Sequence, residues 1–304
     1  MVVYTNYEEA KKDIPYCIAL GSFDGVHIGH QKLLETVINK SKELKCNSMV
    51  YTFKDHPKKA LLPRLSIEMI TQNHKRAEIM SNMGIDVIYF EDFANIMRMD
   101  EETFVKDILI SKFNVKCVVV GYNFTFGNGK KGNAEILKTY GNLYGFDVLV
   151  VDAVTINGEI VSSSLIRKKI KDGQVDDIYI YLGRHYSIDG QVIMGRKNGR
   201  KIGIRTANID INNGVVIPKP GVYLTSTIVN NKEYKSVTNI GTNPTFNGRG
   251  MNIETHIIDF YGDLYDETIE ILFLKWRRQE KVFNTPMELR LQIIEDINFR
   301  LNYK

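Results

Sequence analysis

The chain has 304 residues, 43% of them hydrophobic, and this length exceeds what one core usually serves, so we expect two domains. The net charge of +4 is too small to predict a nucleic-acid partner, although it suits anionic substrates. No apolar run approaches the roughly 20 residues of a membrane helix, and the N-terminus lacks a signal peptide's apolar core, so we expect a cytoplasmic protein with no membrane partner.

The first half of the chain alternates between strand-like and helix-like segments. Continuous apolar runs predict strands, and apolar residues at helical spacing predict helices. The expected strands are 16–23, 47–53, 85–90, 115–121 and 146–154, and the expected helices are 30–44, 68–84, 100–113 and 132–145. This alternation predicts a parallel sheet with helices on both faces, whose ligands bind at the carboxyl ends of the strands. Cys17 and Cys117 lie in two of these strands and are expected to be reduced core residues, and with Cys46 they show no metal-binding spacing.

From about residue 186 the chain consists of short strands interrupted by Gly, Asn and Pro, which predicts an antiparallel sheet closed into a small barrel. We place the domain boundary between residues 180 and 181. A terminal helix is expected after a capping box of Thr285, Pro286 and Glu288. Its predicted buried face consists of Leu289, Ile293, Ile294 and Ile297.

The segment GSFDGVHIGH, residues 21–30, joins the first expected strand to the first expected helix. Its glycines allow the backbone to turn tightly and to approach a ligand closely. The helix start offers unpaired N–H groups and a positive dipole end, which favour phosphate. Beside it, His27 and His30 can donate hydrogen bonds to a triphosphate. The alternative is that both histidines only cap the helix.

A group of small polar residues precedes another expected helix. Ser162, Ser163 and Ser164 can cap this helix or contact a ligand. One turn later, Arg167 is either a fork for phosphate or a solvated charge.

An aromatic segment follows the fourth strand. Asn123 can pair its amide with the edge of a heterocycle or with a ribose, and Phe124 and Phe126 can stack on a flavin ring or belong to the core. His56, which precedes Pro57, is either a ligand contact or an ordinary loop residue.

The segment GRKNGRKIGIRTANID, residues 195–210, places Gly195, Gly199 and Gly203 among basic residues, as in a loop around polyphosphate. Thr206 and Asn208 lie on one side of an extended chain, and hydroxyl and amide oxygens suit Mg²⁺. The alternative is that both are ordinary turn residues.

Residues 27–30 read HIGH, which is similar to the phosphate-binding signature of class I aminoacyl-tRNA synthetases and of nucleotidylyltransferases. The neighbouring sequence distinguishes the two. In order, LGSFDGVHIGH, VYTFKDHPKKAL, VVVGYNFTFGNGKKGN and VSSSLIRKKIKDG resemble the adenylyltransferase half of bifunctional bacterial riboflavin kinase/FAD synthetases. The 195–210 segment, NIGTNPTFNG, IETHIIDFYGDLY and EKVFNTPMELRLQI resemble the kinase half, so that the resemblance covers residues 15–300.

This resemblance implies an α/β fold class: a Rossmann-like nucleotidylyltransferase domain followed by a six-stranded antiparallel β-barrel with a terminal helix. It implies Mg²⁺ as cofactor, ATP as co-substrate, and riboflavin, FMN and FAD as ligands. The implied transferase ATP site comprises Gly21, Phe23, Gly25, His27, His30, Ser162, Ser163, Ser164 and Arg167, and the implied flavin site comprises His56, Asn123, Phe124 and Phe126. The implied kinase site comprises Gly195, Gly199 and Gly203, with Thr206 and Asn208 on Mg-ATP and Glu254 as general base.

The sequence departs from the family pattern at three positions. Ile204 and Arg205 stand where the family has Phe and Pro, and Asp266 stands where Gly is common. Because proline fixes φ, Arg205 either loosens the loop or reaches the phosphates. Three alternatives therefore stay open: an adenylyltransferase with an impaired kinase half, a non-catalytic flavin- or RNA-binding regulator, and a synthetase fragment. The phosphate-binding residues favour the bifunctional enzyme.

Overall fold

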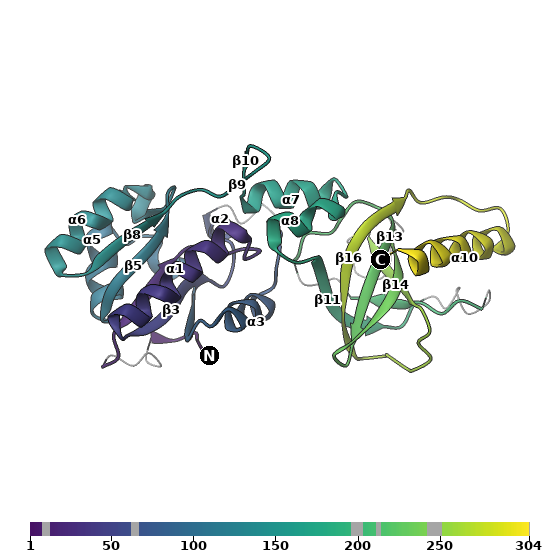
Figure 1. Cartoon of the computed structure of the whole chain (residues 1–304), viewed down its shortest axis with the longest axis horizontal. Coiled ribbons are helices and arrows are strands. Elements are labelled where there is room, and N and C mark those ends of the chain that lie inside the picture. The colour runs from purple at the N-terminus through teal and green to yellow at the C-terminus, as the bar shows by residue number, and fades with distance from the viewer. Residues whose placement is uncertain (8–12, 62–66, 196–202, 211–213, 242–250, 304) are drawn as a thin grey trace. The chain divides into compact units, whose positions relative to one another are not determined.

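The structure, a computed structural model, describes residues 1–7, 13–61, 67–195, 203–210, 214–241 and 251–303 (Figure 1). The chain divides into two compact units, Met1–Ser163 and Ser164–Lys304. The boundary that the sequence places between residues 180 and 181 stays a prediction.

The first unit is built on a six-stranded parallel sheet, as the sequence predicts. Its strand order is β1-β4-β3-β2-β5-β8. The strands are β1 (Val2–Tyr4), β2 (Tyr16–Leu20), β3 (Asn47–Phe53), β4 (Val87–Glu91), β5 (Val115–Gly121) and β8 (Asp147–Val151). Strand β1, which the sequence analysis did not predict, pairs with β4 at the edge of the sheet.

Helices cover both faces of this sheet because its strands are apolar on both sides. One face packs against α1 (Ile28–Leu44) and α3 (Asn73–Met83). The other packs against α6 (Ala134–Tyr144) and a π-helical segment, Phe104–Ile110, in place of the expected α-helix 100–113. Helix α3 begins later than predicted because the N–H groups of Ile70 and Thr71 bond to the Asp24 carboxylate.

Short elements complete the first unit and the segment that follows it. The short helices are α2 (Pro57–Leu61), α4 (Phe93–Ile96), α5 (Glu101–Thr103), α7 (Ser163–Lys171) and α8 (Ile178–Leu182), with 3₁₀ turns at Asn128–Lys130 and Val175–Asp177. The antiparallel pairs are β6 (Thr125–Phe126) with β7 (Gly132–Asn133), and β9 (Thr155–Ile156) with β10 (Glu159–Ile160).

The second unit contains a closed, six-stranded antiparallel barrel of order β11-β12-β15-β14-β13-β16, which confirms the expected architecture. The strands are β11 (Tyr186–Ile193), β12 (Ala207–Ile209), β13 (Gly221–Val229), β14 (Lys232–Gly241), β15 (Asn252–Ile257) and β16 (Thr268–Arg278). Buried hydroxyl groups link several strands: Thr238 bonds to Thr225 at 2.8 Å and to Thr255 at 2.9 Å. These groups are tolerated in the core because they satisfy one another.

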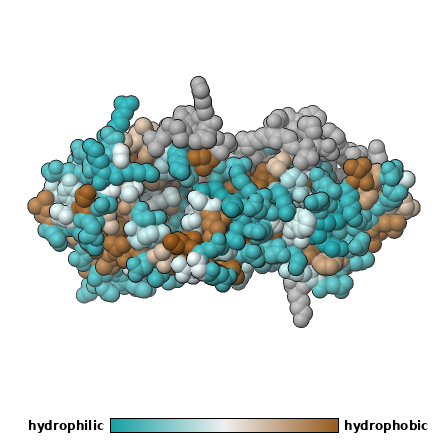
Figure 2. All heavy atoms as spheres, turned by 90° about the horizontal axis from the view of Figure 1, so that it is seen from above, coloured by the Kyte–Doolittle hydropathy of each residue, from teal (hydrophilic) through white to brown (hydrophobic). Residues whose placement is uncertain are grey.

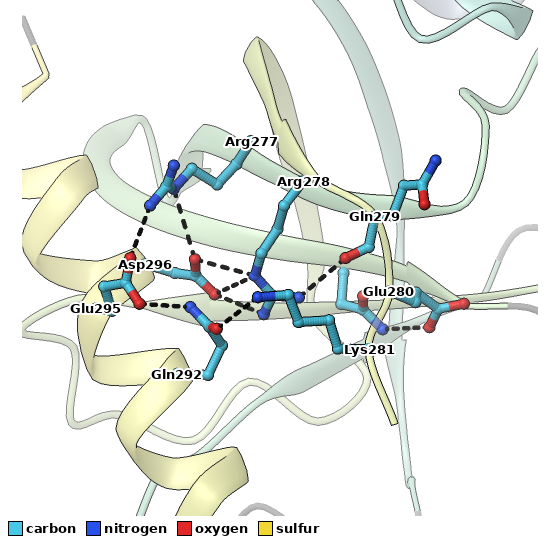
Figure 3. A network of polar contacts seen from close by, with 9 residues as sticks. Arg277, Arg278, Gln279, Glu280, Lys281, Gln292, Glu295 and Asp296 are labelled. Atoms are coloured by element: carbon cyan, nitrogen blue, oxygen red, sulfur yellow. Dashed lines mark hydrogen bonds and ion pairs between the residues drawn. The ribbon is translucent and has the colours of Figure 1, made fainter. Parts of the chain in front are cut away.

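The terminal helix α10 (Pro286–Asn302) begins at the predicted capping box, in which Thr285 accepts from the backbone N–H of Glu288. The residues of the predicted buried face, Leu289, Ile293, Ile294 and Ile297, are half-buried, whereas the other large apolar side chains of the helix, Met287, Leu291, Phe299 and Leu301, are exposed. The buried residues are Asp296, which pairs with Arg278 (Figure 3), and Arg300, which donates to the carbonyl oxygen of Thr225 at 2.7 Å. Asp296 and Arg300 lie at helical spacing from Ile293 and Ile297, so the charged contacts share the face of the predicted apolar residues.

Cys17 and Cys117 are buried, as expected, and lie in register on β2 and β5. Their mutual hydrogen bond and their burial raise the pKa of the Cys17 thiol, which favours the unreactive thiol form.

Figure 2 shows a surface on which hydrophilic residues predominate and hydrophobic residues form small groups. In the parts of the chain that the structure describes, no helix is long and apolar enough to cross a membrane.

Candidate active sites

The loop between β2 and α1 has a strained backbone. Phe23 and Val26 adopt positive φ values of 47° and 41°, which non-glycine residues rarely do, and Gly25 has a φ of 83°. Such strain is typical of functional sites. Phe23 is fully buried, so any ligand contact from it comes from its backbone, and a Cβ at Gly21 would lie 3.1 Å from its ring.

His27 is the N-cap of α1. Its Nδ1 accepts a hydrogen bond from the backbone N–H of His30 at 3.2 Å, so the proton of a neutral His27 ring lies on Nε2. A Cβ at Gly29 would lie 3.2 Å from this ring, which explains the glycine. His27 therefore caps the helix, and it retains an N–H donor beside the helix start.

His30 stacks on His27 with ring centroids 3.6 Å apart, and Phe23 meets it edge-on at 5.1 Å. Burial, followed by the proximity of His27 and Arg76, lowers the pKa of His30 well below 6.5. The ring is thus neutral at neutral pH. Its buried Nδ1 has no hydrogen-bond partner among the residues that the structure describes, as expected of an atom that meets a ligand.

Two buried charged residues support this loop, and the sequence analysis missed both. Asp24 is fully buried and accepts from the backbone N–H groups of Ile70 and Thr71. Arg76 of α3 is also fully buried, and burial lowers its pKa to about 10. The sequence contains one signal for Arg76. It is a charged residue at a position of the expected helix 68–84 where the helical spacing predicts a core residue.

Arg76 joins the carboxyl ends of two strands. It donates to the carbonyl oxygens of Ser22 at 2.7 Å and Phe53 at 2.6 Å, and to Asn73. Ser22 is the second residue after β2, so this contact holds the first residues of the histidine loop.

We expect Arg76→Met to destabilise the protein by about 2–4 kcal/mol, because the carbonyl oxygens of Ser22 and Phe53 each lose a charged hydrogen-bond donor. Urea unfolding followed by circular dichroism measures this. Lys75→Met in the same helix is the control and should cost less than about 1 kcal/mol, since Lys75 is less buried than Arg76 and its ion pair with Glu78 is partly exposed to solvent. Equal losses from the two variants would contradict the role given to Arg76.

The structure brings one predicted serine to the histidine loop. Oγ of Ser163 donates to the carbonyl oxygen of Asp24 at 2.9 Å. Ser162 is half-buried beside it. Ser164 and Arg167 follow in α7 and belong to the second compact unit, so their approach to the histidines stays a prediction.

The predicted flavin residues lie near the carboxyl ends of β3 and β5. Asn123 is exposed, and Phe124 is half-buried and stacks on Phe126 at 5.6 Å. Phe126 is a core residue. Nδ1 of His56 accepts from the backbone N–H of Lys58 at 3.2 Å, so His56 supports the start of α2.

In the barrel, most of the predicted kinase residues lie together. Thr206, Asn208 and Gly195 line one cavity of about 260 Å³ together with Arg205 and His256. A Cβ at Gly195 would overlap the Asn208 amide, so this glycine permits the close approach. Nδ1 of His256 bonds to the carbonyl oxygen of Arg205 at 2.7 Å, which holds the loop before β12.

Glu254 of β15 lies between two asparagines. It pairs directly with Asn208 of β12 on one side and with Asn239 of β14 on the other, so the three side chains project from one face. Asn252 donates to its carboxylate at 2.6 Å. Glu254 does not itself line the described cavity but is adjacent to it through Asn208.

Of the predicted kinase-site glycines, Gly203 has a φ of 77°, and Gly199 lies outside the described residues. One departure from the family pattern has a local explanation. Asp266 has a φ of 65°, a conformation that Asp tolerates better than most residues, so it replaces a glycine at little cost. Arg205 is exposed at the cavity.

A parallel α/β sheet with paired histidines at its first helix, followed by a closed barrel, places the chain among two-domain transferases of nucleotidyl and phosphoryl groups. The FAD synthetase family profile matches residues 9–165, and the riboflavin kinase profile matches residues 182–303. The chain belongs to the family of bifunctional riboflavin kinase/FMN adenylyltransferases.

Relatives of known sequence and structure match nearly the whole chain. It is 33% identical over 302 residues to the bifunctional riboflavin kinase/FMN adenylyltransferase of Bacillus subtilis (strain 168), covering 97% of this chain and 94% of that protein. It is 32% identical to that of Buchnera aphidicola subsp. Schizaphis graminum (strain Sg), covering 94% and 93%. A crystal structure named as a macrolide-efflux protein from Streptococcus pneumoniae is 29% identical, with a TM-score of 0.91 and coverage of 100% and 99%.

Proposed function

We propose that FMN is made at the Thr206–Asn208–Glu254 site of the barrel and that FAD is made at the histidine loop of the first unit. As a member of its family, the chain phosphorylates riboflavin with ATP and then joins FMN to AMP from a second ATP, releasing pyrophosphate. The observation that carries the assignment is that His27 and His30 lie in the first folded unit, whereas Thr206, Asn208 and Glu254 lie in the second.

In FAD formation the FMN phosphate is itself the nucleophile. A P–O bond forms to the α-phosphorus of ATP, and the bond to pyrophosphate breaks. No protein nucleophile is needed, so the chain contributes positioning and charge stabilisation. The N–H groups at the start of α1 and the imidazole N–H groups of His27 and His30 would meet the triphosphate, with Arg167 and the serines completing the site.

In FMN formation a hydroxyl group of the flavin's ribityl chain attacks the γ-phosphorus of ATP, and ADP leaves. Glu254 would accept the proton of this hydroxyl, because an ordinary carboxylate is ionised at neutral pH. Asn208, directly opposite Glu254, would bring the ATP phosphates to the same place.

The residues present suit Mg²⁺ at the kinase site. Thr206 and Asn208 offer a hydroxyl and an amide oxygen in one cavity, and oxygen donors are what Mg²⁺ prefers. When bound, the ion neutralises charge on the phosphates. The backbone of Gly195 lies close to the Asn208 amide and limits the positions that the amide oxygen can adopt as a ligand.

The purified chain, incubated with ATP and Mg²⁺, tests the assignment by chromatography. Riboflavin should be converted to FMN and FAD, and supplied FMN should be converted to FAD. Conversion of FMN without any conversion of riboflavin would favour the alternative of an impaired kinase half.

Arg205, which stands where the family has Pro, lines the kinase cavity, and its effect on ATP binding can be measured. We expect Arg205→Ala to raise the KM for ATP in riboflavin phosphorylation about fivefold, because an exposed charge beside phosphate contributes about 1 kcal/mol. The KM for riboflavin should not change, and Arg205→Lys, which keeps the charge, should behave like the wild type. An unchanged KM for ATP in Arg205→Ala would show that this side chain does not reach the phosphates.

A further inference from the structure

A second carboxylate lies close to Glu254. Asn239 of β14, the direct neighbour of Glu254 across the sheet, donates through Nδ2 to Oε1 of Glu280 at 3.3 Å. Glu280 is the second residue after β16. The same Glu280 oxygen lies over the end of β14, where a Cβ at Gly241 would approach it to 3.0 Å. Glu280 is thus connected to the proposed general base, Glu254, through a single residue, Asn239.

The residues on either side of Glu280 are fixed to α10 (Figure 3). Arg278 donates to Oδ2 of Asp296 from Nε at 3.1 Å and from Nη2 at 2.7 Å. Lys281 donates to Gln292 at 3.2 Å. Asp296 is only 1% exposed, so water does not screen its pair with Arg278 as it screens surface ion pairs. Between these two anchors, the side chain of Glu280 extends away from α10 and toward Asn239.

The chemistry of the contact decides which way the Asn239 amide faces. An ionised carboxylate only accepts hydrogen bonds, so Asn239 must present its NH₂ group to Glu280. Its carbonyl oxygen then remains for a different donor. Because the proposed general base Glu254 must meet a hydroxyl group of the polyol chain of riboflavin, this chain would also lie beside Asn239, and its hydroxyl groups are donors.

We propose that Glu280 is a positioning residue of the kinase site, which orients the Asn239 amide so that its oxygen accepts a hydrogen bond from a polyol hydroxyl of the flavin beside Glu254. This inference rests on the kinase function proposed above. The Arg278–Asp296 pair would act one step further back, by holding the end of β16 from which Glu280 extends.

Steady-state kinetics of riboflavin phosphorylation by the full chain test the proposal. Glu280→Ala should raise the KM for riboflavin about tenfold, with a smaller change in kcat and no change in the KM for ATP, because a substrate contact is lost. Glu280→Gln keeps an acceptor oxygen and should recover most of the wild-type KM. Gln279→Ala, a change at the exposed neighbour, is the matched control and should leave both KM values unchanged.

A double-mutant cycle distinguishes positioning from a direct or general effect. In an Asn239→Ala background, Glu280→Ala should change the KM for riboflavin less than twofold, because the amide that it orients is gone. A full tenfold change in that background, or a wild-type KM in Glu280→Ala alone, would overturn the proposal.

The failure of the proposed function has a different signature. A wild-type chain that makes no FMN from riboflavin would overturn the kinase assignment and this proposal with it. Active wild type with unaltered Glu280 variants would overturn the proposal alone. Thermal unfolding of each variant reports whether the barrel is intact.

Discussion

His30→Ala is expected to reduce FAD formation from FMN about 10²- to 10³-fold while leaving FMN formation from riboflavin within twofold of the wild type. Removing one preorganised donor to the charge that develops in a transition state typically has an effect of this size. Coupled assays with FMN or with riboflavin as the only flavin measure the two rates. Because the pKa of His30 lies well below 6.5, its ring stays neutral as the pH falls from alkaline values to 6.5. Protonation of His30 should therefore cause no loss of activity in that range.

His74→Ala is the matched control for this experiment, since His74 is an exposed histidine of α3 in the same unit. It should leave both rates unchanged. A His30→Ala protein that unfolds like the wild type and still forms FAD at the normal rate would remove the histidine loop from the mechanism.

Glu254→Gln should have the opposite effect, reducing FMN formation about 10²- to 10⁴-fold and sparing FAD formation from supplied FMN. General-base catalysis contributes about this much, and glutamine keeps the size of the side chain while losing the basic group. Measured kcat values for riboflavin phosphorylation decide the question, with KM values expected to change little.

The control is Glu267→Gln, at an exposed carboxylate between β15 and β16, which should leave both reactions unchanged. If Glu254→Gln abolished both reactions in a folded protein, the division of the two activities between the units would be wrong.

The sequence predicted the elements whose signal is local. The apolar strands, the helix that begins within the HIGH residues and the capping box at Thr285 are all set by residues close together in the chain. Patterns of this kind fail where distant groups compete. Helix α3 begins late because Asp24 accepts a hydrogen bond from the backbone N–H of Ile70, 46 residues further along the chain. The burial of Asp296 in α10 was not predicted because its partner, Arg278, lies in a different element.

The candidate sites divide in the same way. Sequence reasoning named His27, His30, Thr206, Asn208 and Glu254 because their spacing and residue types form short motifs. It did not find Arg76 or Glu280, since each acts on residues that are far away in the chain and near in space.

By itself, then, the sequence determined the fold class, the presence of two units and the short motifs proposed to bind phosphate, because hydrophobic periodicity and glycine placement act over a few residues. Only the tertiary structure decided that a neutral His30 stacks on His27 near a buried arginine, and that Glu254 lies between two asparagines. The physical reason is that burial and strand register, which set protonation states and side-chain neighbours, arise from contacts between segments that the linear chain keeps apart.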